Sequence, residues 1–187
     1  MTATEYLLTL GECLSTPIAT ERGVILPLDR AMDTWANHVA HIRAVQRVIH
    51  LIGNGGSAAV VAHAQNDLVK AAGVRAHCYQ DVPLLTAFAN DHGYEKGYTD
   101  ALAIWLEYDD MLIAVSSSGA SPNMLHAARR ATEASAVLVT LTGFEPTNPL
   151  RQLGDLNFYV PSSDYGHVEI THQALLHCLT DRVGHAR

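Results

Sequence analysis

The sequence has few cysteines, which often stabilise small secreted domains, and no long apolar run of the kind that spans a membrane. Its three cysteines are widely spaced and odd in number among 187 residues, which argues against a disulfide framework or a paired-cysteine metal site. No apolar run approaches the ~20 residues that a membrane-spanning helix needs. The first residues lack the basic and apolar segments of a secretion signal. We therefore expect a cytoplasmic protein without a membrane partner.

Positive charge is also scarce, because 12 Lys and Arg accompany 19 Asp and Glu and the formal net charge is −7. A nucleic-acid groove needs a basic face, so we expect no nucleic-acid partner. Small anions remain possible ligands, since loop and helix dipoles act locally. The composition, 48% hydrophobic and 17% charged, is typical of a folded globular protein. At this length the chain fits one domain, residues 1–187.

Five short apolar runs alternate with helical patterns along most of the chain. The runs are nearly continuous in apolar character, as strands buried on both faces of a parallel sheet are. The alternation predicts an α/β fold, a doubly wound five-stranded parallel sheet flanked by helices. The expected strands are 48–52, 74–78, 111–115, 136–141 and 156–160, and the expected helices are 58–72, 83–107 with a break near 90–93, 122–134 and 167–183.

Two further helices, near residues 3–15 and 26–44, precede the first expected strand. They are additional to the α/β core, which we place at 46–187. Additions of this kind often serve contacts between subunits, and we assign residues 1–45 to that role.

Two loops rich in glycine and serine follow the first and third expected strands, at residues 51–57 (LIGNGGS) and 115–121 (VSSSGAS). Ser57 is the expected N-cap of one following helix, and Ser121 of the other, with Pro122 at its first position. Backbone N–H groups, hydroxyls and helix N-termini at one sheet edge suit a phosphate. The alternative is that both loops are simply tight turns. The common nucleotide-binding patterns are absent.

Together, the tracts at 53–57, 86–91, 116–121 and 139–143 resemble the sugar isomerase (SIS) domain family and, within it, the phosphoheptose isomerases. The resemblance extends over nearly the whole chain. It implies a homotetramer with active sites between subunits, a sugar phosphate as substrate and, in many members, zinc. It assigns substrate contacts to Asn90 and Asp91, and phosphate contacts to Asn54, Gly55, Gly56, Ser57, Ser116, Ser117, Ser118 and Ser121.

A second group of residues has the chemistry of a metal site. His63 and Asp67 are spaced i, i+4 on one helix, while Glu169 and His177 share a face of the last helix. Two histidines and two carboxylates could form a tetrahedral zinc site. Alternatively, His63 is a core histidine, and the other pair lies on a solvated face. The resemblance favours the metal: both histidines fall where the family has histidines, Asp67 where it has a ligating glutamate and base, and Glu169 where it has a glutamine ligand.

The resemblance implies aldose–ketose isomerisation through an enediol, by default of sedoheptulose 7-phosphate to D-glycero-D-manno-heptose 7-phosphate. We assign Asp67 as the base, Glu169 as the competing candidate, and His177 as the acid/base that moves a proton between substrate oxygens. Besides the two altered carboxylates, residues 71, 166 and 167 depart from the family pattern. Two alternatives therefore remain: an isomerase for a different phosphosugar, and a non-catalytic SIS module that binds a phosphosugar or a protein.

Overall fold

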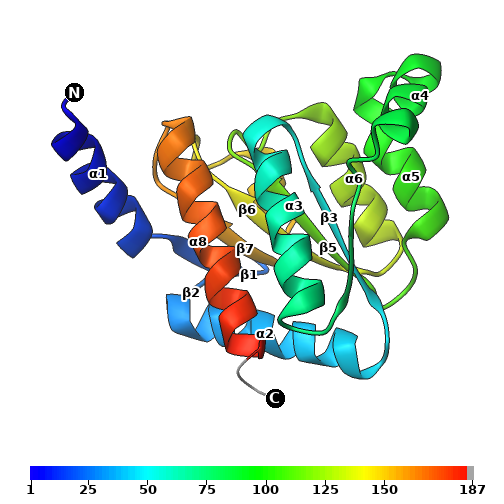
Figure 1. Cartoon of the computed structure of the whole chain (residues 1–187), viewed down its shortest axis with the longest axis horizontal. Coiled ribbons are helices and arrows are strands. Elements are labelled where there is room, and N and C mark those ends of the chain that lie inside the picture. The colour runs from blue at the N-terminus through cyan, green and yellow to red at the C-terminus, as the bar shows by residue number, and fades with distance from the viewer. Residues whose placement is uncertain (185–187) are drawn as a thin grey trace.

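The computed structural model describes residues 1–184, and in it one sheet lies between two groups of helices (Figure 1). The last three residues of the expected domain lie outside the described part. The strands are β1 (Ile18–Glu21), β2 (Val24–Leu26), β3 (Val48–Gly53), β4 (Arg75–Cys78), β5 (Met111–Ser116), β6 (Val137–Thr142) and β7 (Leu156–Tyr159). The helices are α1 (Ala3–Ser15), α2 (Leu28–Ala44), α3 (Gly55–Lys70), α4 (Val82–His92), the 3-10 turn η1 (Tyr94–Lys96), α5 (Gly97–Trp105), α6 (Pro122–Glu133), α7 (Pro149–Leu153) and α8 (Tyr165–Gly184).

The sheet has the strand order β2-β1-β7-β6-β5-β3-β4. Its last five strands are parallel, which confirms the predicted parallel core. The sequence reading missed β1 and β2, which add an antiparallel hairpin beside β7. Their turn consists of Arg22 and Gly23, both with positive φ, as a two-residue type I′ turn requires. β1 contains Thr20 and Glu21, and β2 has only three residues, so neither resembles the longer, nearly continuous apolar runs that predict the parallel strands.

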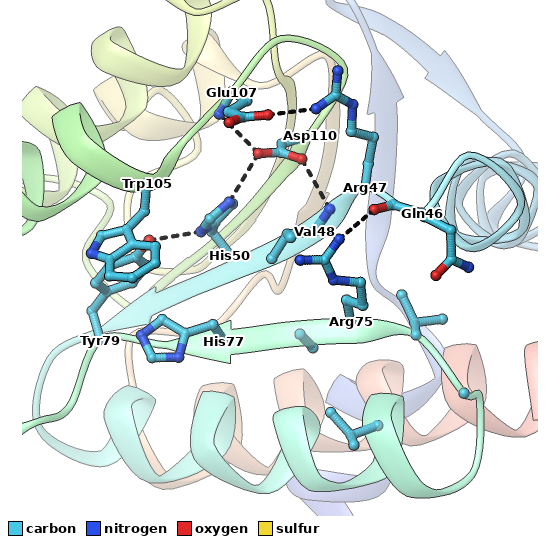
Figure 2. A pocket seen from close by; sticks show the side chains of 14 residues that line it. Gln46, Arg47, Val48, His50, Arg75, His77, Tyr79, Trp105, Glu107 and Asp110 are labelled. Carbon is cyan, nitrogen blue, oxygen red and sulfur yellow. Dashed lines mark hydrogen bonds and ion pairs between the residues drawn. The ribbon is translucent and has the colours of Figure 1, made fainter.

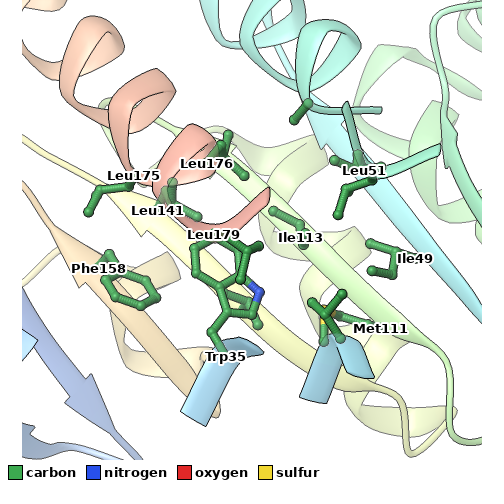
Figure 3. Close-up of a cluster of buried hydrophobic side chains, with 14 of the residues drawn as sticks. Trp35, Ile49, Leu51, Met111, Ile113, Leu141, Phe158, Leu175, Leu176 and Leu179 are labelled. Atoms are coloured by element: carbon green, nitrogen blue, oxygen red, sulfur yellow. The ribbon is translucent and has the colours of Figure 1, made fainter. Parts of the chain in front are cut away.

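Most of the core consists of two apolar clusters, one on each face of the sheet, and a small third cluster contains Cys13, Val160 and Val168. Every residue of β5 is buried, as expected for a strand covered on both sides. One cluster lies between the sheet and α2, α3 and α8, and contains Trp35 and Phe158 with ring centroids 5.0 Å apart (Figure 3). The other lies under α5 and α6. Because Trp35 is fully buried, α2 belongs to the core layer. In contrast, α1 projects beside α8 (Figure 1).

The helix starts differ in part from expectation. Ser121 is the N-cap of α6 with Pro122 at N1, as predicted, although its side chain makes no capping hydrogen bond. The prediction of Ser57 as an N-cap is wrong, because α3 begins at Gly55 and its N-cap is Asn54. Gly55 has a φ of +54°, which glycine adopts at low cost and which starts the helix one turn early. No helix among residues 1–184 is long and apolar enough to cross a membrane.

Candidate functional site: a phosphate pocket and a histidine–aspartate cluster

The two glycine- and serine-rich loops meet at the carboxyl edge of the sheet, where β3 and β5 lie side by side. The chain crosses over at this point, since β4 lies on one side of β3 and β5 on the other. The loops line a cavity of about 330 Å³. Its lining residues are Asn54, Gly55, Gly56, Ser57, Ser116, Ser117, Ser118, Ser121, Tyr165 and Glu169. All eight residues assigned to phosphate by sequence therefore lie together.

No Lys or Arg among residues 1–184 lines this cavity, so the positive partial charges that face it come from backbone groups. The N-terminus of α3 lies at one loop and that of α6 at the other, and the first N–H groups of a helix have no partner within the helix. Their dipoles place partial positive charge where the loops meet. Such an arrangement binds phosphate or another small anion.

Ser117 supplies a further donor. The residue is 4% exposed and lines the cavity, and its hydroxyl has no hydrogen-bond partner among the described residues. Its backbone is fixed, since the Ser117 carbonyl accepts a hydrogen bond of 2.9 Å from Gly143 N–H. A buried hydroxyl without a partner is costly, and a ligand oxygen in the cavity would satisfy it.

The two sides of the pocket are tied together by a residue that sequence reasoning missed. Asn123 in α6 is buried and forms two reciprocal amide hydrogen bonds with Asn54, each 2.9 Å long. The hydroxyl of Tyr94 also donates to Asn54 Oδ1, at 2.9 Å. These bonds fix the side chain of Asn54 at the cavity. No sequence signal identified Asn123, because its partner lies 69 positions away.

The carboxylate of Glu169 is an unusual member of an anion pocket. It lies against Gly56, where an added Cβ would collide with the carboxylate oxygens. Burial raises the pKa of Glu169, because removal from water disfavours the charged form. The carboxylate therefore brings negative charge close to a bound phosphate whenever it is ionised.

The second part of the site is a cluster of His63, Asp67 and His177. The first two lie on α3 and the third on α8, and these helices pack side by side in the same direction (Figure 1). Asp67 Oδ2 lies 3.3 Å from His63 Nε2 and 3.2 Å from His177 Nδ1. The imidazole rings meet edge to face with centroids 4.9 Å apart. Both histidines are about half exposed, so the cluster is open to solvent.

The donor set of this cluster fits a divalent metal. One ligand atom from each residue lies within 4.8 Å of the others. Donor atoms that bind tetrahedral zinc at about 2.0–2.1 Å lie about 3.3 Å from one another, which is close to the distances from Asp67 Oδ2 to the two histidine nitrogens. Three protein ligands would leave a coordination position for substrate.

Of the residues predicted as metal ligands, Glu169 lies outside this cluster. It precedes His177 by eight residues on α8, or about 12 Å along the helix axis. Its carboxylate lies in the phosphate pocket instead. Asn90 and Asp91, the predicted substrate contacts, are exposed near the end of α4, hydrogen-bonded to each other at 2.9 Å and absent from the cavity lining.

Comparison with known proteins gives consistent matches over most of the chain. The family model described as "SIS domain" matches residues 19–143. Phosphoheptose isomerase from Mycobacterium tuberculosis (strain ATCC 25177 / H37Ra) is 34% identical over 160 residues, which cover 79% of this chain and 78% of the relative. Phosphoheptose isomerase from Burkholderia pseudomallei (strain K96243) is 36% identical over 142 residues, covering 73% and 72%.

Solved structures match the fold. A phosphoheptose isomerase from Francisella tularensis has a TM-score of 0.85 and 22% identity, covering 98% of each chain. Phosphoheptose isomerase from Neisseria gonorrhoeae has a TM-score of 0.80 and 22% identity, covering 96% of this chain and 93% of its own. The likeness includes the seven-stranded, mostly parallel sheet flanked by helices.

Proposed function

The chain belongs to the SIS-domain family, and from that membership we propose that it is a sugar-phosphate isomerase with sedoheptulose 7-phosphate as its default substrate. The observation that carries the proposal is the pairing of an anion pocket with a cluster of proton-transfer groups beside one pair of helices. The two curated relatives have the name of this activity.

The spacing of the two parts suits a long acyclic sugar. The cluster is displaced from the pocket by about 12 Å along α8, the rise from Glu169 to His177. An extended seven-carbon sugar phosphate spans roughly 10 Å from phosphorus to C1, with C–C bonds of about 1.5 Å. Phosphate in the pocket would therefore bring C1 towards the level of His177 along α8, whereas a three-carbon sugar phosphate would be too short.

In this arrangement Asp67 removes the proton from C1 of the ketose and returns it to C2. The electron pair moves through an enediol, and His177 transfers the hydroxyl proton from O1 to O2. Nδ1 of His177 faces Asp67, while its Nε2 has no hydrogen-bond partner among the described residues and is free for a substrate oxygen. If His63, Asp67 and Nδ1 of His177 held a divalent ion, it would polarise the carbonyl, and the Nε2–H of His177 would give its proton to O2 and take up the proton of O1. Glu169 is the weaker candidate base because it lies at the phosphate end.

The test is turnover by the purified protein with added zinc on a panel of five- to seven-carbon sugar phosphates. Proton exchange at C1 and C2, followed by NMR in D₂O, identifies the reacting carbons. We expect interconversion of sedoheptulose 7-phosphate and its aldose, with decreasing rates on shorter substrates. Preference for another sugar phosphate would move the assignment to that sugar. No turnover of any member would overturn the proposal.

A non-catalytic phosphosugar-binding module is the second candidate, because the pocket alone suffices for binding. Retention of Asp67 and His177 in direct contact favours the enzyme. The variants Asp67→Asn and His177→Ala distinguish the enzyme from the binding module. If neither variant changed metal content or turnover, the binding module would be the better description.

We further infer a homotetramer with active sites between subunits, as the family resemblance implies. Helix α1 supports this, since Leu7 and Leu8 are 63% and 67% exposed on a helix that packs mainly on α8. Light scattering should give four times the chain mass, and Leu8→Glu should lower it. A monomer mass for the unaltered protein would contradict the inference.

A further inference from the structure

A second and larger cavity, of about 770 Å³, lies where β3, β4 and β5 begin, and therefore at the edge of the sheet opposite the phosphate pocket. None of the residues assigned to phosphate, substrate or metal lines it. Figure 2 shows that its side chains form two unlike walls, one aromatic and one cationic.

The aromatic wall consists of Trp105, His77 and Tyr79 (Figure 2). The rings of His77 and Tyr79 meet edge to face at 4.8 Å, and those of His77 and Trp105 are tilted with centroids 6.5 Å apart. Trp105 is 61% exposed, whereas the other tryptophan, Trp35, is fully buried. A large ring left open beside a cavity is a surface on which a planar ligand can stack.

The cationic wall consists of Arg47 and Arg75 (Figure 2). Arg47 is paired with Glu107 at 2.6 Å. Arg75 donates to the backbone carbonyl of Gln46 at 2.8 Å and makes no ion pair with any residue among 1–184. Its charge is therefore available for an anionic group, to which a guanidinium can donate two parallel hydrogen bonds.

Between the walls lies a buried chain of hydrogen bonds that the proposed reaction does not use. His50 Nε2 lies 3.1 Å from Asp110 Oδ2, and His50 Nδ1 lies 2.7 Å from the Tyr79 hydroxyl. Burial lowers the pKa of His50 and keeps the imidazole neutral. Nε2 then donates to the carboxylate, and Tyr79 donates to Nδ1. The phenol oxygen retains only acceptor capacity, which suits an N–H or O–H group of a ligand.

We propose that this cavity is a second ligand site, for a planar heteroaromatic ring that bears an anionic group, the chemistry of a nucleoside monophosphate. The ring stacks at Trp105 and His77, and the anion pairs with Arg75. Along β4 the two ends are compatible with such a molecule, because Arg75 and His77 lie on one face of the strand, two residues or about 7 Å apart.

Calorimetric titration with adenosine 5′-monophosphate tests the proposal. Excess ribose 5-phosphate, present throughout, occupies the phosphate pocket. We expect binding that is about tenfold tighter than that of adenosine, which lacks the anion, or of inorganic phosphate, which lacks the ring. Tryptophan fluorescence should change on binding, and the change should disappear in Trp105→Leu.

Arg75→Gln and Trp105→Leu should each weaken binding about tenfold. Arg129→Gln, at an exposed arginine of α6 away from both cavities, should not change it. Absence of binding at millimolar nucleotide would overturn the proposal. So would equal affinity in all three variants, or binding that is seen only when ribose 5-phosphate is left out, which would place the nucleotide in the phosphate pocket instead.

Discussion

The phosphate pocket and the His63–Asp67–His177 cluster lie beside the same two helices but are constructed in different ways. The pocket is formed largely by backbone: short loops, glycines and the first turns of α3 and α6. The cluster is formed entirely by side chains and exists only because α8 packs against α3. The pocket can therefore tolerate side-chain substitutions, whereas a single substitution in the cluster would destroy it. We expect binding and turnover to respond separately to substitution.

The sharpest test of that separation is Asp67→Asn. Loss of a general base typically costs 10²–10⁴-fold in rate, so we expect kcat to fall by at least about 100-fold. Along α3 the phosphate pocket ends at Ser57, ten residues or almost three turns from Asp67, so substrate affinity should change less than threefold. Steady-state kinetics and calorimetry measure the two quantities. Asp33→Asn, at an exposed residue of α2, is the matched control and should leave both unchanged. Equal losses of affinity and kcat would show that the two parts act as one.

His172 links the two parts, since it lies on α8 between Glu169 and His177 and is fully buried. Burial lowers its pKa to about 4, with Nε2 3.1 Å from the Thr142 carbonyl. In the folded protein His172 stays neutral down to about pH 4, whereas in the unfolded chain it takes up a proton below about pH 6.5. Stability is therefore lost as the pH falls from 6.5 towards 4, by about 3 kcal/mol for this group.

Urea unfolding at pH 7 and pH 4, for the unaltered protein and His172→Leu, measures this loss. Thr142 also accepts a hydrogen bond from Val160, so its carbonyl keeps a partner in the variant. We expect the acid-induced loss of stability to be about 3 kcal/mol smaller in His172→Leu. An identical loss in both proteins would mean that His172 is not held neutral.

A smaller effect is expected from Asn123→Leu, which removes the tie between the loops. Asn54 would lose both amide hydrogen bonds and keep only that from Tyr94. Loss of a buried partner costs about 1–3 kcal/mol, and we expect phosphate-pocket affinity to fall about tenfold. Calorimetry with sugar phosphate measures this change, with Asn37→Leu at an exposed position of α2 as control. Unchanged affinity would show that the backbone alone holds the loops in place.

The same contrast explains what the sequence could predict. Strand-to-helix boundaries rich in glycine and serine are local, so residues 53–57 and 116–121 revealed the pocket without knowledge of the packing. The partnership of Asn54 with Asn123 depends on contacts 69 positions apart, and no local pattern reports it. His63 and His177 were paired through the family resemblance. The sequence did not predict the position of Glu169. Helical spacing shows that Glu169 shares a face with His177, but it does not show which cavity the carboxylate enters.

Glu169→Gln is expected to have the smallest effect, and it decides between the two candidate bases. A charge near the bound phosphate costs roughly 1 kcal/mol at effective dielectric constants between those of protein and water. Its removal should therefore tighten sugar-phosphate binding by about fivefold. If Asp67 is the base, kcat should change little. A loss of at least about 100-fold in kcat would instead make Glu169 the base and place the reacting carbons at the pocket.

The pH dependence of this variant separates charge from shape. Burial raises the pKa of Glu169, so the carboxylate becomes neutral at a higher pH than an exposed glutamate does. As the pH falls through that pKa, the unaltered protein loses the repulsive charge and its affinity should approach that of Glu169→Gln. A fivefold difference that persisted at low pH would arise from the amide group itself, such as a new hydrogen bond to phosphate. Convergence of the two affinities shows that the carboxylate weakens phosphate binding only while it is charged.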